Sequence, residues 1–166
     1  MAYLLDANVF ISAKNLHYGM DFCPAFWDWI VRRHETGDIF SVEKVGDEVL
    51  AIEDELSQWA AARGPAFFLR PETAIFPALS RVSEWATGAR YEPAAVNAFL
   101  QVADYYLVAQ ALASGYAVVT HEIPSASTRK IKIPDACIGL GIKCMSPFEM
   151  LRKERARFVL DGRQAA

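Results

Sequence analysis

The sequence predicts an α/β protein with a central, mainly parallel sheet, and three observations lead to this fold class. The runs Tyr3-Leu4-Leu5 and Tyr116-Ala117-Val118-Val119-Thr120 are short and apolar, as are strands buried on both faces of a parallel sheet. Segments between them place apolar residues at steps of three and four, which is the helical period. Helices therefore alternate with short strands, the pattern that favours parallel pairing.

The individual elements follow from caps, turn residues and apolar spacing. Gly37-Asp38 marks a turn, and Gly64-Pro65 ends a helix whose apolar residues run from Val45 to Trp59. Pro93 opens a later helix, for which Gly115 is a natural C′ residue. The expected order is strand 3–5, helix start and loop 11–20, helix 24–35, strand 39–42, one helix 43–63, strand 67–69, a helix capped at 71–73, a helix from 93 toward 115 with a break near 103–104, strand 116–120, a loop rich in Ser, Thr and Pro, strand 142–145 and helix 147–158.

Length and composition set the broad class of protein. The 166 residues suit one domain, expected over residues 1–160 and followed by a disordered tail at 161–166. With 53% hydrophobic and 22% charged residues, the composition is that of an ordinary globular protein. The net charge of −3 creates no general attraction for polyanions, so binding to nucleic acid would need local basic patches.

The cysteines and the hydropathy pattern predict a location. Cys23, Cys137 and Cys144 have no CxxC spacing, which argues against a disulfide framework or a structural zinc site. No signal-peptide pattern is visible, and no apolar run approaches the roughly 20 residues of a membrane span. A soluble cytoplasmic protein without a membrane partner is therefore expected.

Four acids stand where apolar patterns would not otherwise place a charge. Asp6 and Glu122 each follow a strand, so both are expected at the carboxyl edge of the sheet, where ligands of open α/β sheets bind. Glu48 and Asp104 interrupt apolar helices, and Asp104 occupies a position where a helical wheel expects an apolar residue. The spacings between these four acids are 42, 56 and 18 residues.

The segments that carry these acids resemble, in order, the motifs of PIN-domain nucleases. They are Leu4 to Ile11, Asp47-Glu48-Val49, Ala103 to Ala111 and Val118 to Glu122. The longer pattern, with Trp59 and Lys132 to Cys137, resembles an uncharacterised bacterial subgroup called DUF4411. One departure stands out, because the family's usual final acid is Asp and here it is Glu122.

The resemblance implies a PIN-like three-layer α/β/α fold and a metal-dependent endoribonuclease. Clustered carboxylates repel one another and favour a hard divalent cation, so Mg²⁺ or Mn²⁺ is the expected cofactor. Hydrolysis of single-stranded or structured RNA by in-line attack of water would leave a 5′-phosphate and a 3′-hydroxyl. The residues implied as catalytic and metal-binding are Asp6, Glu48, Asp104 and Glu122, with Asp135 in reserve; those implied as substrate-binding are Asn8, Thr120, Arg129 and Lys130.

The implied biological role is the toxin of a type II toxin–antitoxin system, of the VapC-like kind. Small PIN proteins of this type are neutralised by a protein antitoxin, and dimerisation is a further family expectation. This role rests on analogy with the family rather than on any residue of the chain.

Other interpretations stay open at this stage. Asp6 alone could simply be a helix N-cap, and Asp47 competes with Glu48 as the site acid of its helix. A non-catalytic PIN-like module that binds RNA or protein is the main alternative function. An aspartyl phosphatase or a receiver domain also places Asp after an early strand, but Asp6-Ala7-Asn8 lacks the second Asp of the phosphatase pattern. The histidines favour surface or substrate contacts over metal ligation, and the tryptophans favour core packing: His17, His34 and His121; Trp27, Trp29, Trp59 and Trp85.

Overall fold

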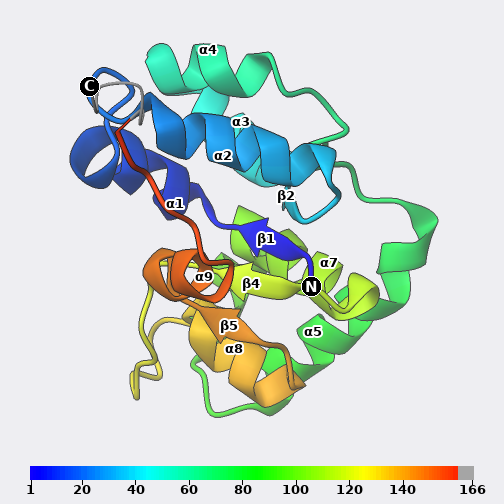
Figure 1. Ribbon diagram of the computed structural model, residues 1–166. Helices are drawn as coiled ribbons and strands as arrows, with labels where there is room; N and C mark the ends of the chain where they lie inside the picture. Colours follow the sequence, from blue (N-terminus) through cyan, green and yellow to red (C-terminus); the bar gives the residue numbers. More distant parts are fainter. Residues whose placement is uncertain (161–166) are drawn as a thin grey trace, which may run out of the picture.

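The computed structural model describes residues 1–160, and a parallel five-stranded sheet lies at its centre (Figure 1). The strand order is β3-β2-β1-β4-β5, and each of the four strand pairs is parallel. The expected tail at 161–166 lies outside the described residues. The strands are β1 Tyr3–Leu5, β2 Ile39–Val42, β3 Phe68–Leu69, β4 Ala117–Val119 and β5 Cys144–Met145.

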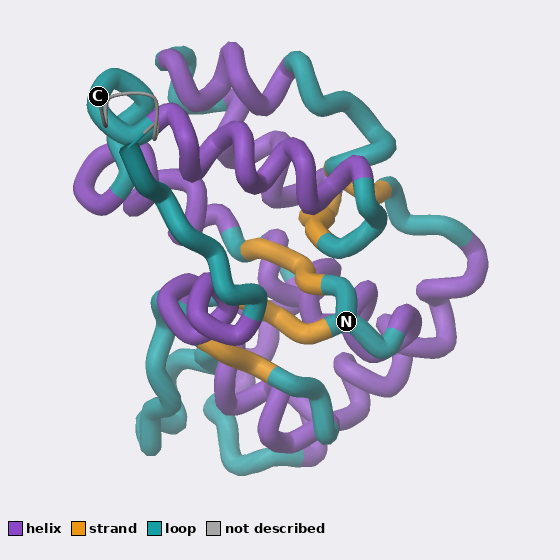
Figure 2. Tube along the Cα trace, viewed as in Figure 1, coloured by secondary structure: helices purple, strands orange, loops and turns teal. Residues whose placement is uncertain are grey.

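Helices cover both faces of this sheet and complete a three-layer α/β/α fold (Figure 2). Helix α2 packs against β2, whereas α7 packs against β2 and β4. The fold class predicted from the sequence is thus confirmed. The helical elements are α1 Ala7–Ser12, the π-helix η1 Ala13–His17, α2 Pro24–Glu35, α3 Glu43–Leu50, α4 Glu55–Ala61, the 3₁₀ helix η2 Thr73–Ile75, α5 Phe76–Gly88, α6 Pro93–Leu100, α7 Ala103–Ser114, α8 Ile133–Leu140 and α9 Pro147–Lys153.

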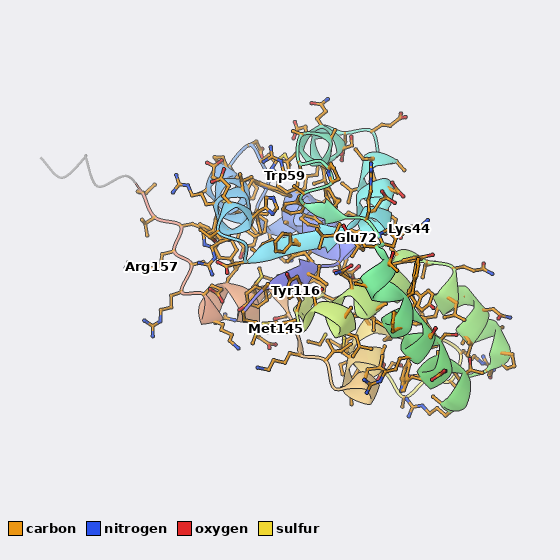
Figure 3. All side chains as sticks on the ribbon, turned by 90° about the vertical axis from the view of Figure 1, so that its right-hand side faces the viewer. Lys44, Trp59, Glu72, Tyr116, Met145 and Arg157 are labelled. Carbon is orange, nitrogen blue, oxygen red and sulfur yellow. The ribbon has the colours of Figure 1, made fainter. Side chains whose placement is uncertain are left out.

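Large apolar side chains fill the space between the layers (Figure 3). All three residues of β1 and all three of β4 are buried, as the two apolar runs predicted. Trp27 of α2 and Trp59 of α4 pack with ring centroids 5.1 Å apart, so these two tryptophans serve packing, as expected. In the described residues, no helix is long and apolar enough to cross a membrane.

The single helix expected at 43–63 is wrong, because the structure divides it into α3 and α4. Glu53 adopts a left-handed φ of 56°, and Asp54 caps α4 through a reciprocal capping box with Ser57. The Asp54 carboxylate also accepts a hydrogen bond from Lys14 Nζ at 2.7 Å. A local cap and an ion pair to a distant helix therefore outweigh an apolar periodicity that runs straight through the break.

Two helices near the chain's C-terminal end also differ from expectation. Helix α8 was not predicted, although Pro134 stands at its start and Gly141, with a φ of 71°, at its end. The last helix ends at Lys153 rather than near 158, since Arg155 takes a left-handed φ of 54°. The chain then runs back toward the N-terminal helices (Figure 1), where Phe158 packs against Tyr18 with centroids 5.8 Å apart.

We expect Gly139→Ala to destabilise the fold by about 1 to 2 kcal/mol, because overpacking exceeds the helix propensity that alanine adds. A Cβ at Gly139 of α8 would lie 2.1 Å from Nε1 of Trp85, so the indole would have to move. Chemical denaturation measures the effect. Gly88→Ala, at a position with nothing within 4 Å, is the matched control. Equal stabilities of the two variants would contradict this account.

Candidate functional site

The candidate site lies where the two central strands β1 and β4 end side by side. Leu5 pairs with Val119, and the backbone N–H of Asp6 donates to the carbonyl oxygen of Val119 at 3.0 Å. Asp6 and Thr120 are therefore the first residues beyond a shared sheet edge. Parallel pairing brings these positions together across 114 residues of sequence, as the edge argument predicted.

Asp6 is a helix N-cap and also a buried charge at this edge. Its Oδ1 accepts a hydrogen bond from the N–H of Ala7 at 2.7 Å, and its Oδ2 accepts one from the Thr120 hydroxyl at 2.9 Å. The residue is only 6% exposed. Burial first, and then the charges of Asp104 and Glu122, raise the pKa of Asp6 to about 7 against these two hydrogen bonds. The N-cap interpretation and the site interpretation of Asp6 are thus compatible.

Thr120 and Asn8 connect the ends of the two strands. The Thr120 hydroxyl oxygen accepts hydrogen bonds from Asn8 Nδ2 at 3.2 Å and from the Glu122 N–H at 3.1 Å. Asn8 Oδ1 in turn accepts from the N–H of His121 at 3.1 Å. These contacts hold the backbone that carries Glu122 against the start of α1. In the structure, Asn8 and Thr120 form hydrogen bonds with other residues of the protein, and their expected contact with substrate stays a prediction.

Asp104 reaches the site because α6 and α7 are separate helices. The break at Gln101 and Val102 puts Asp104 in the first turn of α7, half-buried. Burial raises the pKa of Asp104 to about 6, with further contributions from Glu122 and Glu48. Lys130 opposes this rise. A carboxylate at a helix N-terminus is stabilised by the helix dipole, yet burial and the neighbouring acids together outweigh this effect on the pKa of Asp104.

Glu48 is the acid of α3 whose charge acts on Asp104. Glu48 is exposed on the surface of α3. The protein atoms around its carboxyl still displace enough water to raise its pKa. Asp47, the competing acid on this helix, lies one position earlier and is not among the charges that shift Asp104. Glu48 therefore lies close enough to act on Asp104, and its expected role at the site stays a prediction.

Glu122 and Asp135 both hold α8 in place, though at different points. Glu122 Oε2 accepts a hydrogen bond from the N–H of Ile133, the first residue of α8, at 2.8 Å. Asp135 Oδ2 accepts one from the N–H of Ser125 at 3.0 Å, which fixes the loop before the helix. Asp135 lies in the first turn of α8 rather than in the expected loop. Of the two, Glu122 is the acid whose charge acts on Asp6 and Asp104.

The link between Glu122 and α8 is the part of the site that sequence reasoning missed. It depends on α8 itself, whose signal was Lys132-Ile133-Pro134-Asp135 followed by Gly141. Proline in the first turn and glycine after the last residue are ordinary helix boundaries. The longer Glu122 side chain accordingly does two things, since one oxygen caps α8 while its charge acts on the neighbouring acids.

The two basic residues proposed for substrate binding have different surroundings. Lys130 is exposed, and its charge reaches Asp104. Arg129 points toward Glu92, with 3.9 Å between Nε and Oε1, and its side chain is 85% exposed. Lys130 is therefore the cation associated with the acids.

Carboxylate oxygens suit Mg²⁺ or Mn²⁺ chemically, since these hard cations prefer oxygen and retain several waters. Within residues 1–160, however, no three His, Cys, Asp or Glu side chains converge closely enough to hold an ion by themselves. Burial and the neighbouring acids raise the pKa values of Asp6 and Asp104, so both carboxylates would gain from a cation at this edge. The residues thus fit a cation held by one or two carboxylates directly and by others through water.

Fold and site together define an α/β protein with an acidic centre at the carboxyl edge of its parallel sheet. The chain belongs to the family of the domain of unknown function DUF4411, which matches residues 3–158. Searches among curated proteins and among solved structures gave no match to the chain.

Proposed function

We propose that this protein is a Mg²⁺- or Mn²⁺-dependent endoribonuclease with a PIN-like domain. The observation that carries the proposal is the set of acids around Asp6 and Asp104. Burial raises both pKa values; Asp104 and Glu122 add to the rise at Asp6, and Glu122 and Glu48 add to the rise at Asp104. Such an arrangement destabilises the empty fold and is typical of functional sites. The order of the four acid-bearing segments, which resembles that of PIN-domain nucleases, supports the same conclusion.

Each acid has a proposed task in phosphodiester hydrolysis. Asp6 and Asp104 would hold the cation, which when bound polarises a phosphoryl oxygen and lowers the pKa of a coordinated water. Glu48 and the free oxygen of Glu122 would accept hydrogen bonds from water and orient the attacking molecule. The water oxygen forms the new bond to phosphorus and the bond to the 3′-oxygen breaks, so the products are a 5′-phosphate and a 3′-hydroxyl.

The remaining site residues position these groups and the substrate. Thr120 keeps Asp6 and the Glu122 backbone in fixed relation through hydrogen bonds at 2.9 and 3.1 Å, and Asn8 donates to the Thr120 hydroxyl at 3.2 Å. Lys130, whose charge reaches Asp104, would contact a phosphate of the RNA. Arg129 would contribute to the same contact after leaving Glu92.

The biological setting that we propose is the toxin of a type II toxin–antitoxin pair in the cytoplasm. A protein antitoxin would neutralise the acidic centre, and the active form would be a homodimer. These points rest on the resemblance to VapC-like PIN proteins. The non-catalytic alternative, a PIN-like module that binds RNA or protein, remains the outcome if cleavage fails.

The test is cleavage of a 5′-labelled single-stranded RNA by the purified full-length protein in Mn²⁺, Mg²⁺ or EDTA. We expect products in either metal and none in EDTA, and end-group analysis should find the 5′-phosphate on the downstream fragment. A DNA of the same sequence serves as the control for sugar preference. If the protein binds the RNA but leaves it intact in both metals, the nuclease proposal is wrong and the non-catalytic binding module is favoured.

A further inference from the structure

Three aromatic rings from distant parts of the chain gather beside the acidic centre. His17 and His121 have ring centroids 5.5 Å apart, and each also contacts Phe148, at 5.1 and 5.7 Å. They come from η1, from the residue after Thr120, and from α9. We call His17, His121 and Phe148 the ring cluster.

The backbone fixes the ring cluster next to the site acids. The N–H of His121 donates to Asn8 Oδ1 at 3.1 Å, and His121 directly precedes Glu122. In Figure 1, η1 and α9 lie on the same side of the molecule as the chain that leaves β4. His121 therefore joins the ring cluster to the segment that carries Glu122.

The ring cluster is accessible and has apolar and basic neighbours. His17 is exposed, while His121 and Phe148 are half-buried. Next to them in sequence, Leu16 is 71% exposed and Ile123 is 75% exposed, which is unusual for side chains of this size.

Two exposed cations belong to the segments that carry the rings and the acids. Arg152 is exposed and follows Phe148 by one turn of α9, and Lys130 lies near Asp104. An apolar, π-rich surface with exposed cations on its own segments complements a flat base joined to phosphates. A purely apolar protein segment would leave these cations without partners.

We propose that the ring cluster stacks one unpaired nucleobase of a single-stranded RNA, beside the phosphate that lies at the acids. This inference rests on the proposed nuclease function and names the form of its substrate. An unpaired base exposes its faces to aromatic side chains, whereas a base inside a duplex does not. The cluster would thus select single-stranded segments and set which linkage reaches the acids.

The experiment compares two fluorescent RNAs of ten nucleotides, one intact and one with abasic residues throughout its central half. Binding is measured by anisotropy in EDTA, where no cleavage is expected, and KM for cleavage is measured in Mn²⁺. Phe148→Ala should weaken binding of the intact RNA by about five- to a hundred-fold, the usual contribution of one stacked base. The same substitution should leave binding of the abasic RNA unchanged.

Further variants separate stacking from packing. Phe148→Leu keeps apolar volume without a π face and should reproduce most of the loss, and His17→Ala should reproduce part of it. Phe76→Ala is the control, since Phe76 is 55% exposed on the distant helix α5. Melting curves confirm that each variant is folded.

The outcomes distinguish the two proposals. If the variants lose equal affinity for both RNAs, or if Phe148→Ala and Phe148→Leu lose no affinity, the ring cluster does not stack a base. This conclusion would hold even if the protein cleaves RNA. Base-dependent binding without cleavage would support base stacking by the ring cluster and contradict the proposed nuclease function. A change in oligomeric mass with unchanged RNA affinity would identify the surface as a protein interface and overturn the inference.

Discussion

Asp104→Asn is expected to lower the rate of Mn²⁺-dependent RNA cleavage by at least about a hundred-fold while the protein stays folded. The amide has nearly the shape of the carboxylate but lacks its charge, so the proposed cation would lose a direct ligand. Asp6→Asn should have an effect of similar size. It also disturbs the hydrogen bond from Thr120, which makes Asp104→Asn the cleaner variant.

The neighbouring acids of α3 provide matched controls for this loss. Glu48→Gln should lower the rate about ten-fold or more, since removing a group that orients ligands or waters has effects of this order. Asp47→Asn changes the adjacent exposed acid and should leave the rate unchanged. Single-turnover rates with excess enzyme measure these differences. Full activity in Asp104→Asn would refute the assignment of the acidic centre.

The same Asp104→Asn substitution is expected to stabilise the metal-free protein at pH 8. The folded pKa of Asp104 is about 6 against an ordinary 3.8, and that of Asp6 is about 7, so the folded state holds protons more tightly than the unfolded state. Stability must then fall as the pH rises from about 4 to 8, because these carboxyls lose their protons in the folded protein. Removing one of them should add about 1 to 3 kcal/mol, or roughly 2 to 12 °C in Tm.

Thermal melting in EDTA across pH 5 to 8 measures this effect. The unchanged protein should lose stability as the pH rises, whereas Asp104→Asn should show a flatter profile. Mn²⁺ at about 100 times its Kd should add about 2.7 kcal/mol to the unchanged protein and little to the variant. Asp47→Asn is again the control. If Tm falls with pH equally in the unchanged protein and in Asp104→Asn, the charge of Asp104 does not destabilise the folded protein as proposed.

The elements that sequence reasoning located well are those with strong local signals. The strands at Tyr3–Leu5 and Ala117–Val119 were recognisable because strands in the middle of a parallel sheet are apolar on both faces. Gly115, with a φ of 69°, ended α7 where a glycine C′ residue was expected. Asp6 was identified at the sheet edge for the same reason, since a charge directly after such a strand is unusual.

Elements whose ends depend on contacts between distant residues were harder to predict from the sequence. The periodicity from Val45 to Trp59 continued across Glu53, while the ion pair between Lys14 and Asp54 joins helices 40 residues apart. Helix α8 begins where Glu122 accepts the N–H of Ile133. Neither contact can be read from the residues near the break or the cap.

By itself, the sequence determined the strand positions, the class of fold and the four acids worth testing, because each depends on patterns within a few residues. Only the tertiary structure decided which charges act on one another. Burial, and after it the charges of nearby acids, raise the pKa of Asp6 to about 7 and that of Asp104 to about 6. These shifts arise from distances and desolvation in three dimensions, which residues separated by 98 positions cannot reveal in a linear chain.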